Sequence, residues 1–415
     1  MRLKGFWNYE NRMILVLTVT FGFVFFDRNA FGYLAPFIRP ELGLSNTQVG
    51  LIASVLSLAW ALSALAVGAF FKPAGRRKIT LITMVVIFSL CSVLSGLATS
   101  FLFLFLARML MGFSEGGFLP IAHSLVALES HEKRRGLNMG VMQNLGSNLL
   151  GSWAAPLVLV AVAELFSWRV SFFLAAVPGL IMAVFLWLAV REPETDEEAE
   201  AQVDEGSVLP DRMSMMAMLK YRNVWLCMII SCFMVAWMVL GWNFLPLYYA
   251  EIRGMDEANW SFLMSLLGLS AALGAFVVPG LSDRLGRKPI MIGFCFLGLL
   301  VPLSVLYYEG AFAVLAVLIF VGWLASGAFP VFMATIPSET IPLKYLVTSM
   351  GLVMGTGELI GGVLSPTGAG WAGDVFGLQA PVVIMGGCAA VGGFLSLFLK
   401  ETAPVKVGTG TAASA

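Results

Sequence analysis

Residues 22–38 read GFVFFDRNAFGYLAPFI, and residues 101–120 read FLFLFLARMLMGFSEGGFLP. A helix needs about 20 apolar residues to cross the ~30 Å of hydrocarbon in a bilayer, and both stretches are close to that requirement. Yet the first contains Asp27 and Arg28, and the second contains Arg108 and Glu115. Charge inside a bilayer is costly and persists mainly where it faces a bundle interior or an aqueous cavity. The two stretches therefore predict an all-α membrane protein with charges turned inward.

The rest of the chain has the same character. Its 415 residues are 59% apolar and 12% charged, with a mean hydropathy of +0.88, which is more apolar surface than a soluble core of this size hides. The first apolar run is too long for a signal peptide and lacks a cleavage site of small residues, so we expect it to be retained. The apolar runs predict about twelve transmembrane helices, near 12–37, 46–71, 77–99, 101–127, 137–162, 168–190, 223–249, 258–281, 288–307, 311–336, 344–372 and 379–399.

The basic residues indicate the orientation. Of the 25 Lys and Arg residues, two are intramembrane, three fall in loops of one side, and the remaining 20 lie on the other side. The positive-inside rule then predicts that both termini are cytoplasmic. The basic clusters at 76–78, 133–135 and 284–288 each occupy a short loop between helices, so we expect no nucleic-acid partner.

Enzyme chemistry is not expected. There is no P-loop, no HExxH and no GxSxG in a suitable context, so the usual nucleotide, metal and nucleophile sites are missing. The five cysteines lie in apolar runs without metal-ligand spacing, and His123 and His131 are isolated. We therefore predict neither a metal nor a cofactor. A membrane sensor or receptor without translocation is a remote alternative, since the longest polar segment is only the linker described next.

One acidic segment, EPETDEEAEAQVDEGSVLPDR at 192–212, interrupts the apolar pattern and suits a mobile linker. We expect an N-terminal six-helix half at 1–191, a cytoplasmic linker at 192–221, a C-terminal six-helix half at 222–400 and a disordered tail at 401–415.

The two halves match one another. GAFFKPAGRRK at 68–78 aligns with GLSDRLGRKPI at 280–290, and GFSEGGFLP at 112–120 aligns with GWLASGAFP at 322–330. The glycines at 140, 146 and 151 recur at 351, 357 and 362. Near-constant offsets in chain order predict a parallel duplication with pseudo-symmetric halves and a substrate held between them near the bilayer midplane.

The repeat separates scaffold from candidate function, because a feature present in one half only is not required by the shared frame. In the C-terminal copy, the positions of the four buried charges hold Trp237, Met238, Leu318 and Ala325. Glu358 aligns with Ser147, so this charge is present in the C-terminal half only. Glu129 and Glu339, by contrast, align with each other, so both halves have a glutamate there. We therefore expect the unshared charges to serve function.

These charges suit proton and anion handling. Arg108 and Glu115 are seven residues apart, on one helix face and about 10 Å from each other, so each is free to meet a partner on another helix. A glutamate in such a cavity can bind and release a proton, and an arginine grips a carboxylate in two bonds. The alternative is a static charge network that only fixes helix positions.

The loop G-x-x-D-R-x-G-R-K at 280–288 resembles the cytoplasmic loop signature of the major facilitator superfamily. In the N-terminal half the usual acidic position holds Lys72, so the charge latch that the resemblance implies is expected in the C-terminal half only. The alternative is that these charges merely orient the helices. The candidate gating residues are Gly68, Arg76, Gly280, Asp283, Arg284 and Arg287.

A closer resemblance rests on FDRNAFGYLAPFI, on R-x-x-x-G-x-x-E at 108–115, on Trp168-Arg169, on WNFLPLYYAEIRG and on the PSE at 337–339. Together these resemble the anion:cation symporter family, which includes bacterial sugar-acid and organic-anion permeases and is related to sialin and the vesicular glutamate transporters. The resemblance implies that Asp27 and Glu115 carry protons, that Arg28 grips the substrate, and that Arg108 couples the two.

Other candidate substrate contacts are Tyr33, Trp60, Gln143, Asn144, Trp242, Asn243 and Glu358. Ordinary helix packing explains the aromatic and amide members equally well, and Gln143 is the preferred contact among them. Members of the family often have a neutral amide where this chain has Glu358, which implies a different substrate or an additional proton site.

These observations predict a secondary active transporter of the major facilitator fold that carries a small organic anion, a sugar acid or another carboxylate, by proton-coupled symport and alternating access. No G-P pair of the antiporter type occurs in GSNLLGSWAAP, which favours symport. An organic-anion exchanger or a drug exporter of the same fold is the alternative. By the resemblance we expect a monomer spanning a bacterial inner membrane, with lipid, protons and the anion as its partners.

Overall fold

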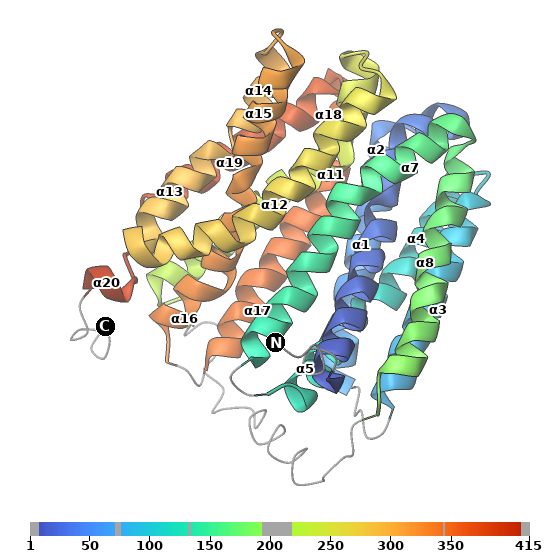
Figure 1. Cartoon of the computed structure of the whole chain (residues 1–415). Helices are drawn as coiled ribbons and strands as arrows, with labels where there is room; N and C mark the ends of the chain where they lie inside the picture. The colour runs from blue at the N-terminus through green and yellow to red at the C-terminus, as the bar shows by residue number, and fades with distance from the viewer. Residues whose placement is uncertain (1–7, 71–75, 132–133, 193–217, 343–344, 408–415) are drawn as a thin grey trace.

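The computed structural model describes residues 8–70, 76–131, 134–192, 218–342 and 345–407, and these ranges form a bundle of long helices (Figure 1). The first half contains α1 (Tyr9–Leu42), α2 (Asn46–Phe70), α3 (Arg77–Gly96), α4 (Phe101–Gly116), α5 (Phe118–Glu129), α6 (Arg135–Gly140), η2 (Val141–Leu145), η3 (Ser147–Ala154), α7 (Ala155–Leu165) and α8 (Trp168–Ala189). The second half contains α11 (Arg222–Leu247), η4 (Tyr248–Ile252), α12 (Glu257–Leu285), α13 (Arg287–Leu297), α14 (Leu300–Tyr307), α15 (Phe312–Trp323), η5 (Leu324–Ala328), η6 (Val331–Thr335), α16 (Ile336–Thr340), α17 (Leu346–Gly357), η8 (Glu358–Leu364), α18 (Ser365–Phe376) and α19 (Gln379–Ser396), followed by the short α20 (Pro404–Val407).

Eleven helical stretches of the described residues are long and apolar enough to cross a membrane, and the predicted span at 344–372 overlaps the succession α17, η8 and α18. The all-α membrane fold is therefore confirmed. Polar caps set several helix starts: the side chains of Asn8, Ser100 and Ser167 each accept a hydrogen bond from a backbone N–H of the first turn. At its other end α1 stops at Gly43, whose φ of 61° suits glycine.

The internal repeat is visible in matching contacts. In each half a serine of the second spanning helix donates to a backbone carbonyl of the fourth, about one turn away from the aligned position: Ser63 Oγ donates to Phe113 at 2.6 Å, and Ser270 Oγ donates to Phe320 at 2.6 Å. The π-helical segments η3 and η8 begin at the aligned positions 147 and 358. The carboxylate of Glu192 accepts the first N–H groups of α3, as that of Glu401 does for α13. The pseudo-symmetric halves predicted from the sequence are thus confirmed.

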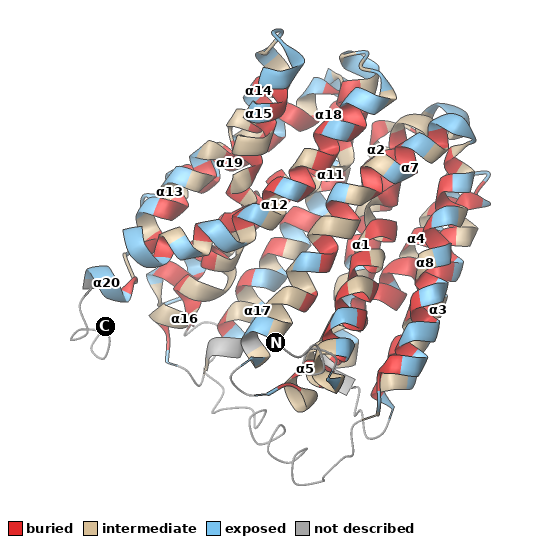
Figure 2. Ribbon diagram, viewed as in Figure 1, coloured by how far each residue is buried: buried red, intermediate tan, exposed pale blue. Residues whose placement is uncertain are grey.

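Large apolar side chains cover the outside of the bundle. Figure 2 shows exposed residues along the outward faces of α8 and α12, and Leu65 and Leu188 are each 71% exposed. A soluble protein rarely exposes so much apolar surface, whereas a helix that satisfies its backbone internally can present such a face to lipid. The bundle is therefore a multi-pass membrane fold.

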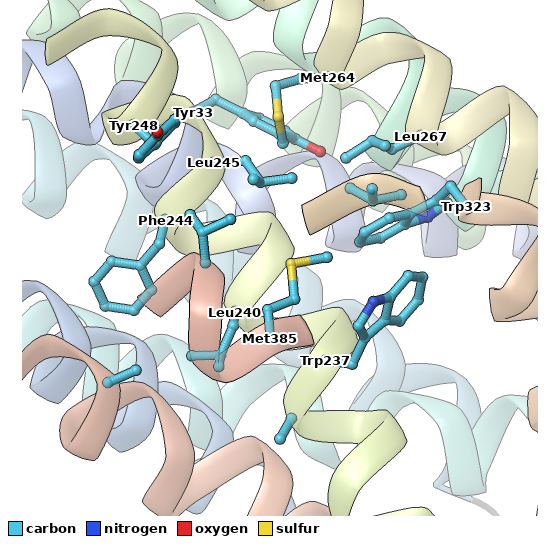
Figure 3. Packing of buried hydrophobic residues seen from close by; sticks show 14 of the residues in the cluster. Tyr33, Trp237, Leu240, Phe244, Leu245, Tyr248, Met264, Leu267, Trp323 and Met385 are labelled. Atoms are coloured by element: carbon cyan, nitrogen blue, oxygen red, sulfur yellow. The ribbon is translucent and has the colours of Figure 1, made fainter. Parts of the chain in front are cut away.

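A buried aromatic cluster joins the halves near mid-bundle. Trp237 and Trp323 have ring centroids 4.4 Å apart, and Trp242 meets Trp323 edge-on at 5.1 Å. Figure 3 shows part of this cluster, with Tyr33 from α1 among the buried side chains of α11 and α12. This packing forms one wall of the cavity described below.

The halves also meet at the end of the bundle away from both termini (Figure 1), which we call the far end. There the carboxylate of Asp374 accepts the backbone N–H groups of Asn46 at 2.7 Å and of Thr47 at 2.9 Å. A Cβ at Gly50 would collide with the carbonyl of Pro366, so the glycine lets α2 and α18 approach closely. Arg39 and Glu251 add an ion pair between the halves.

Two of the expected segments are only partly described. Residues 193–217 of the linker and Lys72 lie outside the described ranges, although Glu192 is placed by its contacts with α3. In the predicted tail, Glu401 accepts hydrogen bonds from α13, and Pro404–Val407 forms α20. The expectation that disorder begins at residue 401 is therefore wrong up to Val407, and residues 408–415 lie outside the described ranges.

Candidate functional site

A cavity of about 240 Å³ lies between the halves, close to the size of a small-molecule site. Helices α1, α2 and η3 of the first half and α11, α12 and η8 of the second contribute to its wall. Its polar and aromatic lining consists of Phe25, Arg28, Asn29, Phe31, Ser57, Trp60, Arg108, Ser147, Asn148, Ser152, Trp242, Asn243, Trp323, Ser326 and Glu358.

Arg28 is the cation most available to a ligand in this cavity. Its guanidinium lies over the ring of Trp60, 5.3 Å from the centroid, and its Nη2 donates to Ser57 Oγ at 3.3 Å. Two carboxylates flank it: Glu115 Oε2 is 3.8 Å from Nη1, and Glu358 Oε1 is 3.9 Å from Nη2. Both distances exceed that of a hydrogen bond, so the guanidinium retains donors for a further anion.

Asp27 and Arg108 form a second, fully buried group behind Arg28. Arg108 Nη1 donates to the backbone carbonyl of Asp27 at 3.1 Å, and Ser92 Oγ donates to Asp27 Oδ1 at 2.7 Å. The guanidinium also lies 5.1 Å from the ring centroid of Phe172. Arg108 thus connects the helix that carries Asp27 and Arg28 to the helix that carries Glu115.

Several atoms of this charge cluster have no hydrogen-bond partner among the described residues. They are Asp27 Oδ2, Arg28 Nη1, Arg108 Nε and Nη2, and both carboxylate oxygens of Glu115. A buried polar group without a partner costs about 1–3 kcal/mol, so the cluster is poorly satisfied as a purely structural network.

The structure brings together some of the candidate substrate contacts and separates others. Trp60, Trp242, Asn243 and Glu358 line the cavity. The following residues are not part of its lining: Tyr33, which is fully buried and whose hydroxyl donates to the carbonyl of Gly151; Gln143; and Asn144, whose amide donates to the carbonyl of Gly140. Tyr33 and Asn144 are thus bonded to backbone carbonyls, and Gln143, the preferred contact, is half-buried outside the lining.

Several lining residues were not among the candidates predicted from the sequence. Asn29 directly follows Arg28, and its Nδ2 donates to the carbonyl of Gly151 at 3.1 Å. Ser57 and Ser326 present hydroxyl groups, and Trp323 presents a ring. Trp323 and Ser326 belong to GWLASGAFP, the copy of the stretch that contains Glu115, so the repeat itself held a signal for them.

Two of the candidate gating residues of the C-terminal half, Asp283 and Arg287, form an ion cluster with Glu339. Arg287 Nη1 lies 2.6 Å from Asp283 Oδ1, and its Nη2 lies 2.8 Å from Glu339 Oε1. Arg284 is exposed, and Gly280 lies in α12 with open space beside it. In the first half Arg76 is exposed, and Gly68 lies in the last turn of α2. None of the residues of this cluster lines the cavity, and the cluster lies at the end of the bundle that carries the termini (Figure 1).

A membrane-spanning bundle of two pseudo-symmetric halves, with charged groups lining a cavity between them, defines a membrane transporter. The chain belongs to the major facilitator superfamily: the family model described as Major Facilitator Superfamily matches residues 17–366, with a second match over 242–414. The protein is accordingly a transporter and not an enzyme, as the sequence predicts.

Three similar proteins illustrate the relationship. A hexuronate transporter of Bacillus subtilis (strain 168) is 30% identical over 283 residues, a match that spans 64% of each chain. A probable sulfoacetate transporter of Cupriavidus necator is 27% identical over 414 residues, covering 94% of this chain and 93% of the relative. Among solved structures, the D-xylose-proton symporter superposes with a TM-score of 0.74 at 17% identity, covering 95% of this chain and 99% of that one, and shares the fold.

Proposed function

We propose that this protein carries a small organic anion into the cell together with protons, by alternating access. The observation that carries the proposal is the position of Arg28, whose guanidinium faces a cavity walled by both halves and keeps donors free for a carboxylate. Relatives named for hexuronate and sulfoacetate transport support an acidic substrate. A sugar acid suits the amide and hydroxyl groups of the lining.

Proton coupling follows because Glu115 and the substrate carboxylate compete for the guanidinium of Arg28. While Glu115 is ionised it attracts the guanidinium from 3.8 Å. When Glu115 takes up a proton that attraction disappears, and the guanidinium is released to a substrate carboxylate. Asp27 is linked to the same event because Arg108 bridges its backbone and the helix of Glu115. Proton binding and anion binding therefore reinforce one another.

Alternating access is supported by where the halves touch. The contacts of Asp374, Gly50 and Arg39 seal the far end, which we assign to the outside of a bacterial inner membrane because the basic loops predict cytoplasmic termini. Rocking of one half against the other would break these contacts and expose the cavity to the outside. Halves at 1–191 and 222–400, acting within one monomer, complete this proposal.

The decisive experiment measures binding and uptake with Arg28 changed. Arg28→Ala should lower the affinity for organic acids at least about a hundredfold, because a charge-assisted bidentate contact is lost. Arg28→Lys should recover only part of this, because an ammonium cannot form the planar fork. Arg12→Ala, an exposed arginine on the same helix, is the matched control and should bind normally. Near-normal binding by Arg28→Ala would overturn the proposed grip.

Transport itself is tested in proteoliposomes. An inward proton gradient should drive accumulation of the acid, and uptake should acidify the lumen. An exchanger of the same fold would instead require substrate on both sides, so counterflow without net uptake would favour that alternative. Export of uncharged drugs with no acid uptake would favour a drug exporter.

A further inference from the structure

Glu358 brings a carboxylate from the second half into the cavity, directly opposite Arg28. Its side chain is 27% exposed, and its Oε1 lies 3.9 Å from Arg28 Nη2. Gly362 leaves room for it, since a Cβ there would lie 2.7 Å from Oε1. The carboxylate is therefore held beside the guanidinium without being locked to it by a hydrogen bond.

The charges around Glu358 are few. It lies on η8, which packs against α2, α11, α17 and α18. Among the described residues, α2 and α17 contain no charged side chain, α11 contains only Arg222 in its first turn, and α18 contains only Asp374 at the far end. Arg28 is consequently the cation next to Glu358 in the cavity. Arg108, on the far side of Arg28 from Glu358, is fully buried.

This arrangement gives the cavity one accessible cation with a carboxylate next to it. One substrate carboxylate can bind to Arg28 by moving Glu358 aside. A second acid group on the same molecule would find no further accessible cation among the lining residues and would meet the negative charge of Glu358. A hydroxyl or ammonium group in the same place would instead donate a hydrogen bond to that carboxylate.

We infer that Glu358 is a specificity residue: it selects substrates with a single carboxylate and a hydrogen-bond donor, hydroxyl or ammonium, near that carboxylate, and it rejects dicarboxylates. This deepens the proposed function and rests on it. The amides of Asn29, Asn148 and Asn243 supply further hydrogen bonds of the kind that a polyhydroxylated chain requires.

The test uses the purified full-length chain and four acids of similar length, with binding followed by calorimetry. Gluconate has one carboxylate and several hydroxyl groups, 2-amino-2-deoxygluconate replaces one hydroxyl by an ammonium, glucarate adds a second carboxylate, and hexanoate has no donor. The wild type should bind the first two, and should bind glucarate and hexanoate at least about tenfold more weakly, the penalty expected for a close like charge or an unpaired acceptor.

The Glu358→Gln variant should narrow the gap between gluconate and glucarate about tenfold, because the like charge is gone while the side-chain shape is kept. Glu358→Asp retains the charge and should keep the selectivity, which separates charge from packing. An unchanged ratio in Glu358→Gln would overturn the inference. So would wild-type protein that binds glucarate as well as gluconate, or binds none of the hydroxylated acids.

The Arg28→Ala variant distinguishes this result from failure of the proposed function. Loss of binding of all four acids in Arg28→Ala supports the proposed contact between Arg28 and the substrate carboxylate. The ratio of the affinities for gluconate and glucarate then tests the role of Glu358 alone. Undiminished gluconate binding by Arg28→Ala would refute the proposed function, and the inference about Glu358 with it.

Discussion

Single residues show that the buried charges are arranged at a cost to stability. Glu115 is fully buried, and neither of its carboxylate oxygens has a hydrogen-bond partner among the described residues. By contrast, Arg287 in the loop cluster is bonded to Asp283 and Glu339 at 2.6 and 2.8 Å. An ion network that only fixes helices is expected to look like the second case. The cavity cluster is therefore better explained by function than by scaffolding.

A glycine four residues beyond Glu358 offers a fine adjustment of the site. Gly362→Ala places a methyl group 2.7 Å from Glu358 Oε1, and the flexible carboxylate must move. We expect the affinity for a hydroxylated acid to change severalfold while the melting temperature stays within about 2 °C, since only a side-chain end is displaced. Gly355→Ala is the matched control, because its Cβ meets open space. Equal affinities in the two variants would contradict this placement of Glu358.

Some residues of the candidate site can be predicted from the sequence, and others cannot. The sequence identified the four intramembrane charges, because charge in a membrane-spanning segment is costly and usually serves a function. These are Asp27, Arg28, Arg108 and Glu115. Tyr33 was not separable from Trp60 in this way, because an aromatic ring suits a core and a cavity wall equally well. Only the packing of α1 against α11 decides that Tyr33 is buried and meets Trp242 edge-on at 6.2 Å.

Between elements, the far-end contact of α18 with α2 is an N-cap supplied by the other half. The carboxylate of Asp374 accepts two backbone N–H groups at the start of α2 and the hydroxyl of Thr47 at 2.5 Å. A helix N-terminus carries unpaired N–H groups and a partial positive charge, so a carboxylate is favoured there. This cap exists only while the halves are closed at the far end.

Asp374→Asn should therefore shift the protein toward opening at the far end. Loss of a charged cap is worth about 1 kcal/mol, roughly a fivefold change in population. Spin labels at Leu97 and Tyr307, which are exposed on opposite halves, should show a larger fraction of long distances. Asp256→Asn is the control, since Asp256 caps α12 within its own half through the N–H of Asn259. The same shift in both variants would show a general loosening instead.

The helices themselves were largely predictable, and their contacts were not. Apolar length located the spans, but α1 continues to Leu42, past Pro36 and Pro40 and beyond the predicted end at residue 37. The helix continues because its end depends on Gly43 and its hydrogen bond to Arg39, not on hydropathy. The contact of Asp374 with Asn46 joins residues 328 positions apart, so no local sequence pattern predicts it.

The whole molecule is a symmetric frame with asymmetric chemistry. Matching carboxylate caps relate the halves, whereas the intramembrane charges of Asp27, Arg28, Arg108 and Glu115 all come from the first half. The repeat made this predictable, because a duplicated sequence shows directly which positions differ. How Glu358 from the second half faces Arg28 depends on the docking of the two halves, which the repeat alone does not determine.

That asymmetry makes proton coupling separable from anion binding. Glu115→Gln mimics the protonated side chain and removes the ionised competitor 3.8 Å from Arg28. Acid binding should persist, and counterflow should persist with it, while the stimulation of uptake by low external pH should fall at least about tenfold. Asp27→Asn should act in the same direction, since Arg108 ties both carboxylates to one network.

The measurement is uptake of a labelled organic acid into proteoliposomes at external pH 5.5 and 7.5, with the counterflow rate of each variant as the reference. Glu164→Gln, an exposed glutamate outside the cavity, should retain the pH response of the wild type. Because the amide variants keep Arg28, they separate the two tasks: lost pH response with intact counterflow assigns the protons to Glu115 and Asp27. An undiminished pH response in both variants would place proton binding elsewhere, with Glu358 the next carboxylate to examine.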